Sequence, residues 1–173
     1  MELAFSAGTL GALDTSSADV IACGLFEDDR PMRGLAAVVD YRLAGRMHGY
    51  VRRGELTGVA DEAFLFPPRP RLGAEKLVVF GWGKSTELDE PASARAVDRL
   101  VRTLVGLGAK RAVVELPGRA RGILDAELAA TLFFRSVEEH GADFTFLLIE
   151  DDEGKKRFAA RIEEEKKRAR RVM

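Results

Sequence analysis

The segment GWGKST at residues 81–86 follows a strand-like apolar run and has the residue types of a phosphate-binding loop. A Walker A loop has the pattern G-x-x-x-x-G-K-[ST], in which the first glycine lets the backbone wrap around a phosphate. The residue five positions before Gly83 is Val78, which lies inside the apolar run, so this wrap is not possible. The acidic residues within 87–90 also place negative charge beside an anion site. We therefore predict a glycine-rich turn with a partly exposed Trp82 rather than a nucleoside triphosphate site.

A second glycine-containing loop, PGRARG at residues 117–122, follows another strand-like run. Gly118 and Gly122 would let a ligand approach the backbone closely, and Arg119 and Arg121 add positive charge where a helix is about to begin. This loop is the best candidate in the sequence for binding an anion or a nucleotide phosphate. A plain strand-to-helix connection explains the same residues, and both interpretations stay open.

The other potentially reactive side chains favour structural roles. Cys23 is the only cysteine, which excludes an intrachain disulfide, and its place at the end of an apolar run favours a buried hydrophobic role. His48 and His140 lie in helical patterns or near their ends, which favours surface or capping positions over metal binding. The acidic runs at residues 27–29 and 150–153 lack the spacing of a calcium loop and are predicted to be solvated. We predict no metal site and no cofactor.

The composition is that of an ordinary globular protein. The 173 residues are 46% hydrophobic and 32% charged, with a net charge of −1, which indicates no general preference for nucleic acid. No run approaches the roughly 20 apolar residues of a membrane helix, and no secretory signal pattern is present. The basic C-terminal stretch is interrupted by acidic residues 163–165, which disfavours nucleic-acid binding. We therefore expect one domain over residues 1–173, in the cytoplasm.

Short apolar runs alternate with longer segments of helical periodicity, which predicts an α/β fold with a mostly parallel sheet. Both glycine-containing loops are predicted to connect a strand to the helix that follows it. The predicted strands lie at residues 3–5, 19–24, 63–66, 76–80, 111–116 and 144–149. The predicted helices lie at residues 32–53, 91–108, 124–141 and 153–173, and the last is a charged C-terminal helix.

Four short segments follow one another along the chain: VDYRLAG at 39–45, TG at 57–58, FLFPP at 64–68 and VVFGWG at 78–83. They resemble the N-terminal domain of the leucyl aminopeptidase family, in which the corresponding helix and strands follow in the same order. The resemblance covers about residues 18–150. Segments 113–124 and 144–151 also resemble the phosphate-cradling loop and the last strand of a macro domain. The resemblance implies a three-layer α/β/α, macro-domain-like fold with a mixed six-stranded sheet.

Two departures from these families bear on activity. In the leucyl aminopeptidase family the metal ligands belong to a large C-terminal domain, whereas this sequence ends at Met173, so we expect no peptidase activity. Macro domains that bind ADP-ribose carry an N-A-A-N-like run after the second strand, and this sequence has ACGL at residues 22–25. ADP-ribose hydrolysis is therefore not expected. Nucleotide binding remains open, and Asp19 resembles the adenine-contacting aspartate of those domains.

The sequence thus supports two functional hypotheses. The first is a non-catalytic binding or assembly module that resembles the aminopeptidase N-terminal domain and pairs with itself or with a protein partner. The alternative is a macro-type module that binds an ADP-ribose-like nucleotide. Neither hypothesis requires a membrane, a metal or a cofactor. The predicted ligand-binding residues of the alternative are Asp19, Gly24, Gly81, Gly83, Gly118, Arg119, Arg121 and Gly122.

Overall fold

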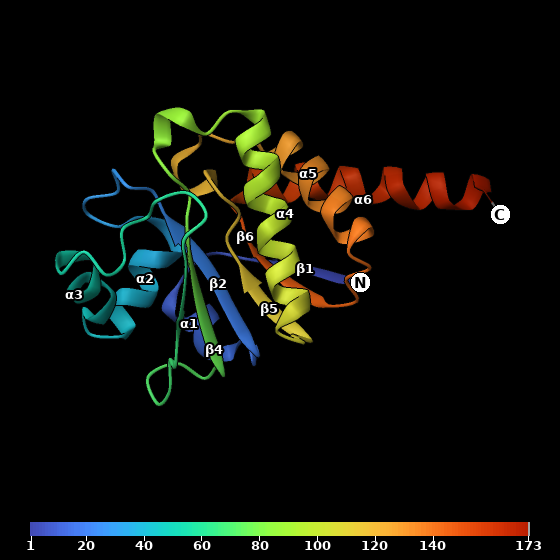
Figure 1. Cartoon of the computed structure of the whole chain (residues 1–173). Coiled ribbons are helices and arrows are strands. Elements are labelled where there is room, and N and C mark those ends of the chain that lie inside the picture. The colour runs from blue at the N-terminus through green and yellow to red at the C-terminus, as the bar shows by residue number, and fades with distance from the viewer. Residues whose placement is uncertain (173) are drawn as a thin grey trace.

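A computed structural model describes the backbone of residues 1–172 and the side chains of residues 1–164 and 167. Six short strands form one sheet in the spatial order β1-β6-β5-β2-β4-β3 (Figure 1). All neighbouring strands are parallel except β3, which is antiparallel to β4. The prediction of a mixed six-stranded sheet is confirmed. The strands are β1 Glu2–Ser6, β2 Val20–Leu25, β3 Ala63–Phe66, β4 Lys76–Gly81, β5 Arg111–Val114 and β6 Thr145–Ile149.

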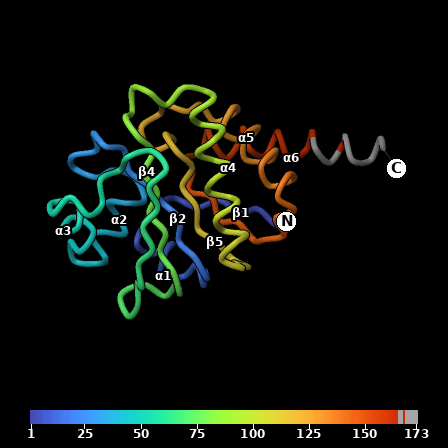
Figure 2. The backbone as a smooth tube through the Cα atoms, viewed as in Figure 1, coloured from blue at the N-terminus to red at the C-terminus, as the bar shows by residue number. Residues whose placement is uncertain are grey.

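Helices cover both faces of the sheet, and Figure 2 traces the chain as it passes between the layers. Residues of α1, α2 and α3 form one apolar core with the sheet, and residues of α4, α5 and α6 form the other. The three-layer architecture implied by the resemblance is therefore present. The helices are α1 Leu10–Thr15, α2 Gly34–Arg42, α3 Arg46–Arg52, α4 Glu90–Gly106, α5 Ala126–Glu139 and α6 Asp152–Val172, with single 3₁₀ turns η1 Ser85–Glu87 and η2 Arg119–Arg121.

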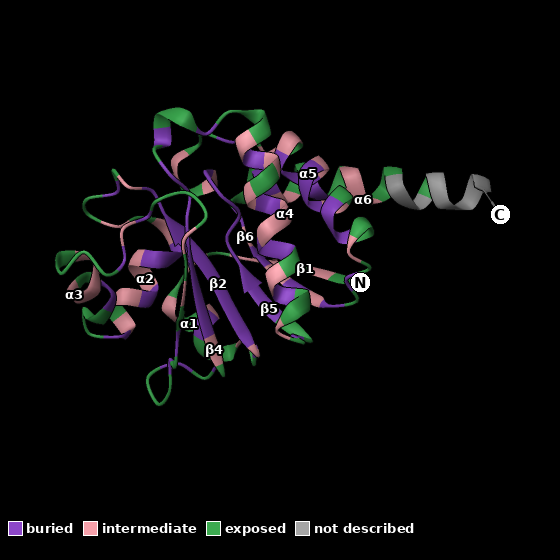
Figure 3. Ribbon diagram, in the orientation of Figure 1, coloured by how far each residue is buried: buried purple, intermediate pink, exposed green. Residues whose placement is uncertain are grey.

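The central strand β2 is buried along its whole length because its side chains alternate between the two cores (Figure 3). Ala22 belongs to the core beneath α4 and α5, whereas Ile21 and Cys23 belong to the core beneath α2 and α3. A continuous apolar run is typical of a strand that is covered on both faces. Five of the strands are parallel, so their carboxyl ends all lie at one side of the sheet, which we call the carboxyl edge. These strands are β1, β2, β4, β5 and β6. Ligands of open α/β sheets usually bind at this edge.

The helix predicted over residues 32–53 is interrupted, so this prediction was wrong in part. Between α2 and α3, Ala44 and Gly45 have φ values of +55° and +78°, a left-handed conformation that an α-helix cannot continue through. Periodicity did not reveal the break because Leu43 before it and Met47 after it both point into the same core.

The C-terminal helix α6 begins at Asp152, close to the predicted start at residue 153. Its docking residue is Phe158, which is fully buried and packs edge-on against Phe5 and Phe133. None of the helices in the described part of the chain combines the length and the hydrophobicity needed to cross a bilayer. Part of the predicted C-terminal helix lies outside what the structure describes. This part comprises the side chains of Lys166, Arg168, Arg170 and Arg171, together with residue Met173.

Candidate functional site

The predicted ligand-binding residues lie at two opposite sides of the sheet. All of them except Asp19 lie at the carboxyl edge or just beyond it. Asp19 precedes β2, and its Oδ2 accepts hydrogen bonds from the backbone amides of Lys110 at 2.8 Å and Arg111 at 2.9 Å. These two bonds, the one from Arg111 first, hold the pKa of Asp19 below its ordinary value. Asp19 therefore links the amino ends of β2 and β5 by hydrogen bonds. It lies at the side of the sheet opposite to the other predicted ligand-binding residues.

The space at the carboxyl edge between β2 and the loop after β5 is filled by Trp82. The indole is only 8% exposed, which corrects the prediction of a partly exposed side chain. It stacks on Phe80, with ring centroids 5.3 Å apart, and it lies against the backbone of Gly24 so closely that a Cβ there would be 2.2 Å from the ring. The hollow that remains between Gly24, Trp82 and Gly118 has a volume of about 10 Å³. That is barely room for one water molecule.

Gly81 and Gly83 make room for the chain itself rather than for a ligand. A Cβ on Gly81 would lie 2.0 Å from the carbonyl oxygen of Val59, and one on Gly83 would lie 3.3 Å from the Cβ of Ala60. The amide of Gly83 donates to the carbonyl oxygen of Gly58 at 2.8 Å. The glycines of the GWGKST segment therefore let the connection before β3 pack against the end of β4.

The loop after β5 uses its own amide groups internally. Gly118 and Gly122 have φ values of +74° and +66°, and they bracket η2. The amides of Arg121 and Ile123 both donate to the carbonyl oxygen of Gly118, and the amide of Gly122 donates to that of Arg119. A phosphate-binding loop instead directs several free amides at the anion. In this loop the amides of Arg121, Gly122 and Ile123 are bonded within the loop and are therefore not available to an anion.

Arg119 is held by a buried carboxylate. Its Nε and Nη2 atoms donate to the two carboxylate oxygens of Glu150 at 2.9 and 2.8 Å, and its Nη1 donates to the carbonyl oxygen of Leu124 at 2.6 Å. The hydrogen bonds with Glu150 raise the pKa of Arg119. Glu150 is 6% exposed, which corrects the prediction that the whole 150–153 run is solvated. The run is solvated only from Asp151 onward because Glu150 still belongs to the end of the sheet.

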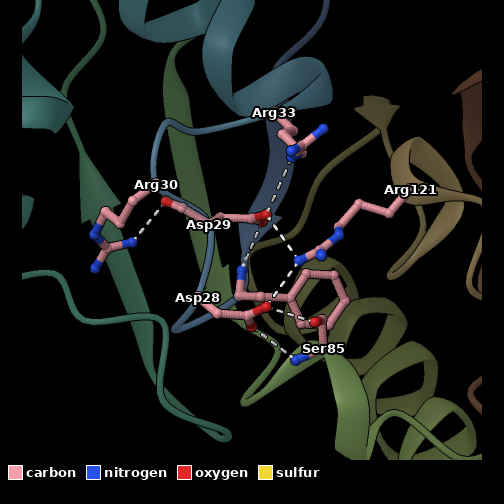
Figure 4. Close-up of polar contacts among 7 residues, drawn as sticks. Asp28, Asp29, Arg30, Arg33, Ser85 and Arg121 are labelled. Atoms are coloured by element: carbon pink, nitrogen blue, oxygen red, sulfur yellow. Dashed lines mark hydrogen bonds and ion pairs between the residues drawn. The ribbon is translucent and has the colours of Figure 1, made fainter.

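Arg121 is paired with two aspartates of the loop after β2 (Figure 4). Its Nη1 lies 3.1 Å from Asp28 Oδ2 and 3.2 Å from Asp29 Oδ1. Asp29 is 4% exposed and also accepts a hydrogen bond from the amide of Phe26, so the predicted solvated run 27–29 is buried at its last residue. Figure 4 shows Arg33 approaching the same carboxylate, at 3.9 Å. The charge of Arg121 is therefore compensated within the protein.

The two residues that suggested a phosphate loop also have protein partners. The Ser85 amide and hydroxyl donate to the two oxygens of Asp28, at 2.8 and 2.5 Å. These bonds, the one from the hydroxyl first, lower the pKa of Asp28 well below its ordinary value. Lys84 pairs with Glu87 at 3.3 Å. Ser85 thus joins the segment after β4 to the loop after β2, whereas the ion pair of Lys84 is local.

Glu115, at the end of β5, is the notable residue that sequence analysis missed. It is 8% exposed, and its Oε1 accepts a hydrogen bond from the amide of Leu35, in the first turn of α2, at 2.9 Å. Burial is the main cause that raises the pKa of Glu115 to about 7, and the negative charges of Glu150 and Asp29 add to it. The sequence did contain a signal for this residue: Glu115 interrupts an apolar run, between Val114 and Leu116. A charged side chain at such a position is rarely buried without a specific role.

The remaining titratable candidates occupy structural positions. Cys23 is fully buried, which raises the pKa of its thiol and keeps it protonated. His48 is exposed, whereas His140 is the C-cap residue of α5, and its Nε2 lies 2.6 Å from Asp98 Oδ1. Among the residues that the structure describes, no three His, Cys, Asp or Glu side chains are placed to hold a metal ion.

A known protein family matches most of this sequence. Residues 21–139 match the family model described as "Cytosol aminopeptidase family, N-terminal domain". A probable cytosol aminopeptidase of Hamiltonella defensa is 32% identical over 104 residues, which are 60% of this chain and 21% of that protein. One from Pseudomonas fluorescens is 31% identical over 116 residues, 67% of this chain and 23% of that protein. The chain thus spans about a fifth of the length of the curated relatives that it matches.

Solved structures share the fold at low sequence identity. A mutant of tomato leucine aminopeptidase superposes with a TM-score of 0.61 and 12% identity, over 92% of this chain and 35% of that one. The Oceanobacillus iheyensis macrodomain with ADP superposes with a TM-score of 0.69 and 8% identity, over 91% of this chain and 90% of that one. The macrodomain of Mycobacterium tuberculosis DarG has a TM-score of 0.64 and 16% identity, over 87% of this chain and 98% of that one. The macro-domain-like fold implied by the resemblance is confirmed.

Proposed function

Because this chain belongs to the cytosol aminopeptidase family, whose N-terminal domain it matches, we propose that it acts as a non-catalytic binding or assembly module. The observation that carries the proposal is the filled space beside Gly24 at the carboxyl edge. The position where ligands of this sheet architecture bind is occupied by Trp82 against Gly24, with about 10 Å³ left. Because no ligand-sized space remains beside Gly24, we infer that the module binds a partner through its outer surface.

The surface that we assign to this role is the outer side of β3. This strand pairs only with β4 in the described sheet, so its other edge offers unpaired backbone groups. Leu65 is 56% exposed on this strand, and Val59, in the preceding connection, is 47% exposed. An apolar edge strand is a template for pairing with another chain, and antiparallel pairing of two β3 strands would extend the sheet across two copies.

Light scattering over a range of protein concentrations tests this proposal. Reversible dimer formation supports self-assembly through the edge of β3. A strict monomer at the highest concentration contradicts self-assembly. Release of leucine from a chromogenic leucyl amide by the pure, metal-supplemented chain would contradict the non-catalytic part of the proposal. We place this role in the cytoplasm, since the relatives are named cytosol aminopeptidases.

The alternative proposal is recognition of an ADP-ribose-like nucleotide. Its support is the similarity of fold to a macrodomain solved with ADP. Against it stand the filled space beside Gly24 and the compensated charges of Arg119 and Arg121. Calorimetric titration with ADP-ribose decides between the two, because saturable heat at millimolar ligand would favour the nucleotide and its absence would exclude it.

A further inference from the structure

A second hollow lies at the carboxyl edge, beside the space that Trp82 fills. Its volume is about 330 Å³, and it is bounded by the end of β1, the end of β6 and the loop after β5. This volume is at the lower end of the roughly 300–1,000 Å³ that small-molecule sites occupy. Ala7 and Ile149 form apolar parts of its wall, and Glu115, Glu150 and Asp151 supply carboxylates.

The charge in this hollow is negative in sum. Arg119 is its only cation among the described lining residues, and two of its donors are taken by Glu150. Asp151 is exposed and accepts a hydrogen bond from the amide of Gly154 at 2.7 Å. Glu115 forms no ion pair with any residue that the structure describes. An anionic ligand such as a phosphate would be repelled from this hollow, whereas a cation would be attracted.

Glu115 is one of the residues that line the hollow, and its two carboxylate oxygens differ in their hydrogen bonding. Its Oε1 accepts the amide of Leu35, but no donor in the described part of the chain reaches its Oε2. The residue as a whole is largely buried, at 8% exposure. An ionised carboxylate in such a place carries a desolvation cost that a hydrogen-bonded cation would offset. The geometry therefore leaves an acceptor that the protein itself does not use.

The groups that face Glu115 come from four surrounding elements. Burial is the main cause that raises the pKa of Glu115 to about 7, and the negative charges of Glu150, at the end of β6, and of Asp29, in the loop after β2, add to it. Nearby positive charges are already paired: Arg119 of η2 is bound to Glu150, and Arg33 and Arg121 face Asp29. None of these three arginines forms an ion pair with Glu115.

We propose that this hollow binds a small primary ammonium compound, with the ammonium group donating to Glu115 Oε2 and the alkyl part lying against Ala7 and Ile149. An ammonium group is a compact charge with three donors, which suits a single open oxygen beside a further carboxylate. The site goes beyond the assembly role and does not depend on it, since the oligomeric state of the chain and the occupancy of this hollow are measured separately.

The proposal predicts a pH dependence of binding. The ammonium pairs with the ionised form of Glu115, and the fraction of that form increases as the pH rises through about 7. Binding between about pH 6 and about pH 8 should therefore tighten roughly tenfold and should release a proton. An ammonium probe such as n-butylamine keeps its charge across this range.

Nuclear magnetic resonance titration of the full chain with n-butylamine tests the site. We expect saturable shifts of the Leu35 and Glu115 amide signals at tens of millimolar amine, and no such shifts with n-butanol. Glu115→Gln keeps an oxygen acceptor for Leu35 but loses the charge, so it should weaken binding at least tenfold at about pH 8. The matched control Glu127→Gln changes an exposed carboxylate outside the hollow and should leave binding unchanged.

Three outcomes would overturn the proposal: no saturable shift in the unmodified chain, equal binding by Glu115→Gln, or equal shifts with n-butanol. Calorimetry on the unmodified chain provides a second measurement if the variant does not fold. Binding heats near pH 7 should differ between two buffers of different ionisation enthalpy, because binding releases a proton. Equal heats in the two buffers would contradict the involvement of Glu115.

Discussion

The indole of Trp82 lies directly against the backbone of Gly24, so that a Cβ on this glycine would come within 2.2 Å of the ring. Gly24 belongs to the central strand β2, and Trp82 follows the neighbouring strand β4. This contact fills the position at which an open α/β sheet usually binds a ligand. It is therefore the contact that most clearly separates a surface-binding role from a nucleotide-binding role.

Substitution of Gly24 tests how tightly this contact is packed. Gly24→Ala should lower the free energy of unfolding by about 1–3 kcal/mol, because the added methyl group must displace a buried ring. Gly106→Ala is the matched control, since its Cβ would meet nothing within 4 Å near the end of α4. It should be neutral or should stabilise by up to ~1 kcal/mol. Urea denaturation measures both, and equal stabilities of the two variants would contradict the packing.

Trp82 is the only tryptophan, so intrinsic fluorescence reports directly on the filled space. Because the indole is 8% exposed, its emission should be blue-shifted relative to the unfolded chain and should resist quenching by acrylamide. Addition of ADP-ribose should leave the spectrum unchanged. Strong quenching in the native state, or a saturable spectral change with the nucleotide, would show that the indole leaves this space.

Glu115 should make the stability of the protein depend on pH. Its folded-state pKa, about 7, is above the ordinary value of 4.5, so the folded state binds more protons than the unfolded state between these values. The stabilisation is complete below about pH 4.5 and is lost as the pH rises through about 7, by up to ~3 kcal/mol. Glu115→Gln should remove this dependence and be the more stable chain at about pH 8. Parallel loss of stability in Glu115→Gln would contradict the assignment, and Glu127→Gln controls for a change of net charge.

The pair Arg119–Glu150 should be important for stability, because both side chains are largely buried and hydrogen-bonded in two places. Arg119→Ala should destabilise by about 3–5 kcal/mol, since it leaves Glu150 buried without a partner. The double variant Arg119→Met with Glu150→Leu should recover much of this loss. Denaturant unfolding of the single and double variants measures the coupling.

Arg157→Ala is the matched control for this cycle. Arg157 is 56% exposed and lies 4.0 Å from each of its acidic neighbours, so the change should cost less than about 1 kcal/mol. If the double variant is no more stable than Arg119→Ala, the loss does not come from an unpaired carboxylate.

The edge of β3 should carry the self-association of the chain. Leu65→Lys places a charge on the exposed face of this edge strand, and it should weaken dimer formation roughly tenfold or more. Ile123→Lys is the control, because Ile123 is also exposed but follows η2, in the loop after β5. Sedimentation equilibrium distinguishes the two. An equal effect of both substitutions would mean that general repulsion, and not the β3 edge, determines association.

Local residue patterns predicted the order of the strands and most of the helices, and the resemblance to a known domain predicted the fold class. Buried strands such as β2 and amphipathic helices such as α4 are encoded by local periodicity, which a single chain displays without any partner segment. The break between α2 and α3 and the short helix α1 were missed. The break depends on backbone conformation at Ala44 and Gly45, and α1 is only six residues long, less than two full turns.

What the candidate site can do depends on contacts that form only in the folded chain. Glycine and arginine residues in the loop after β5 suggested anion binding, but whether such a loop binds an anion depends on where its amides and charges are directed. Contacts with residues distant in sequence direct these charges. Glu150 forms an ion pair with Arg119, and Asp28 and Asp29 form ion pairs with Arg121. The indole of Trp82 fills the space beside Gly24. Such pairings form only when the strands are assembled side by side. For the same reason the burial of Glu115 beneath Gly34, and the open oxygen that follows from it, could not be inferred from the order of residues alone.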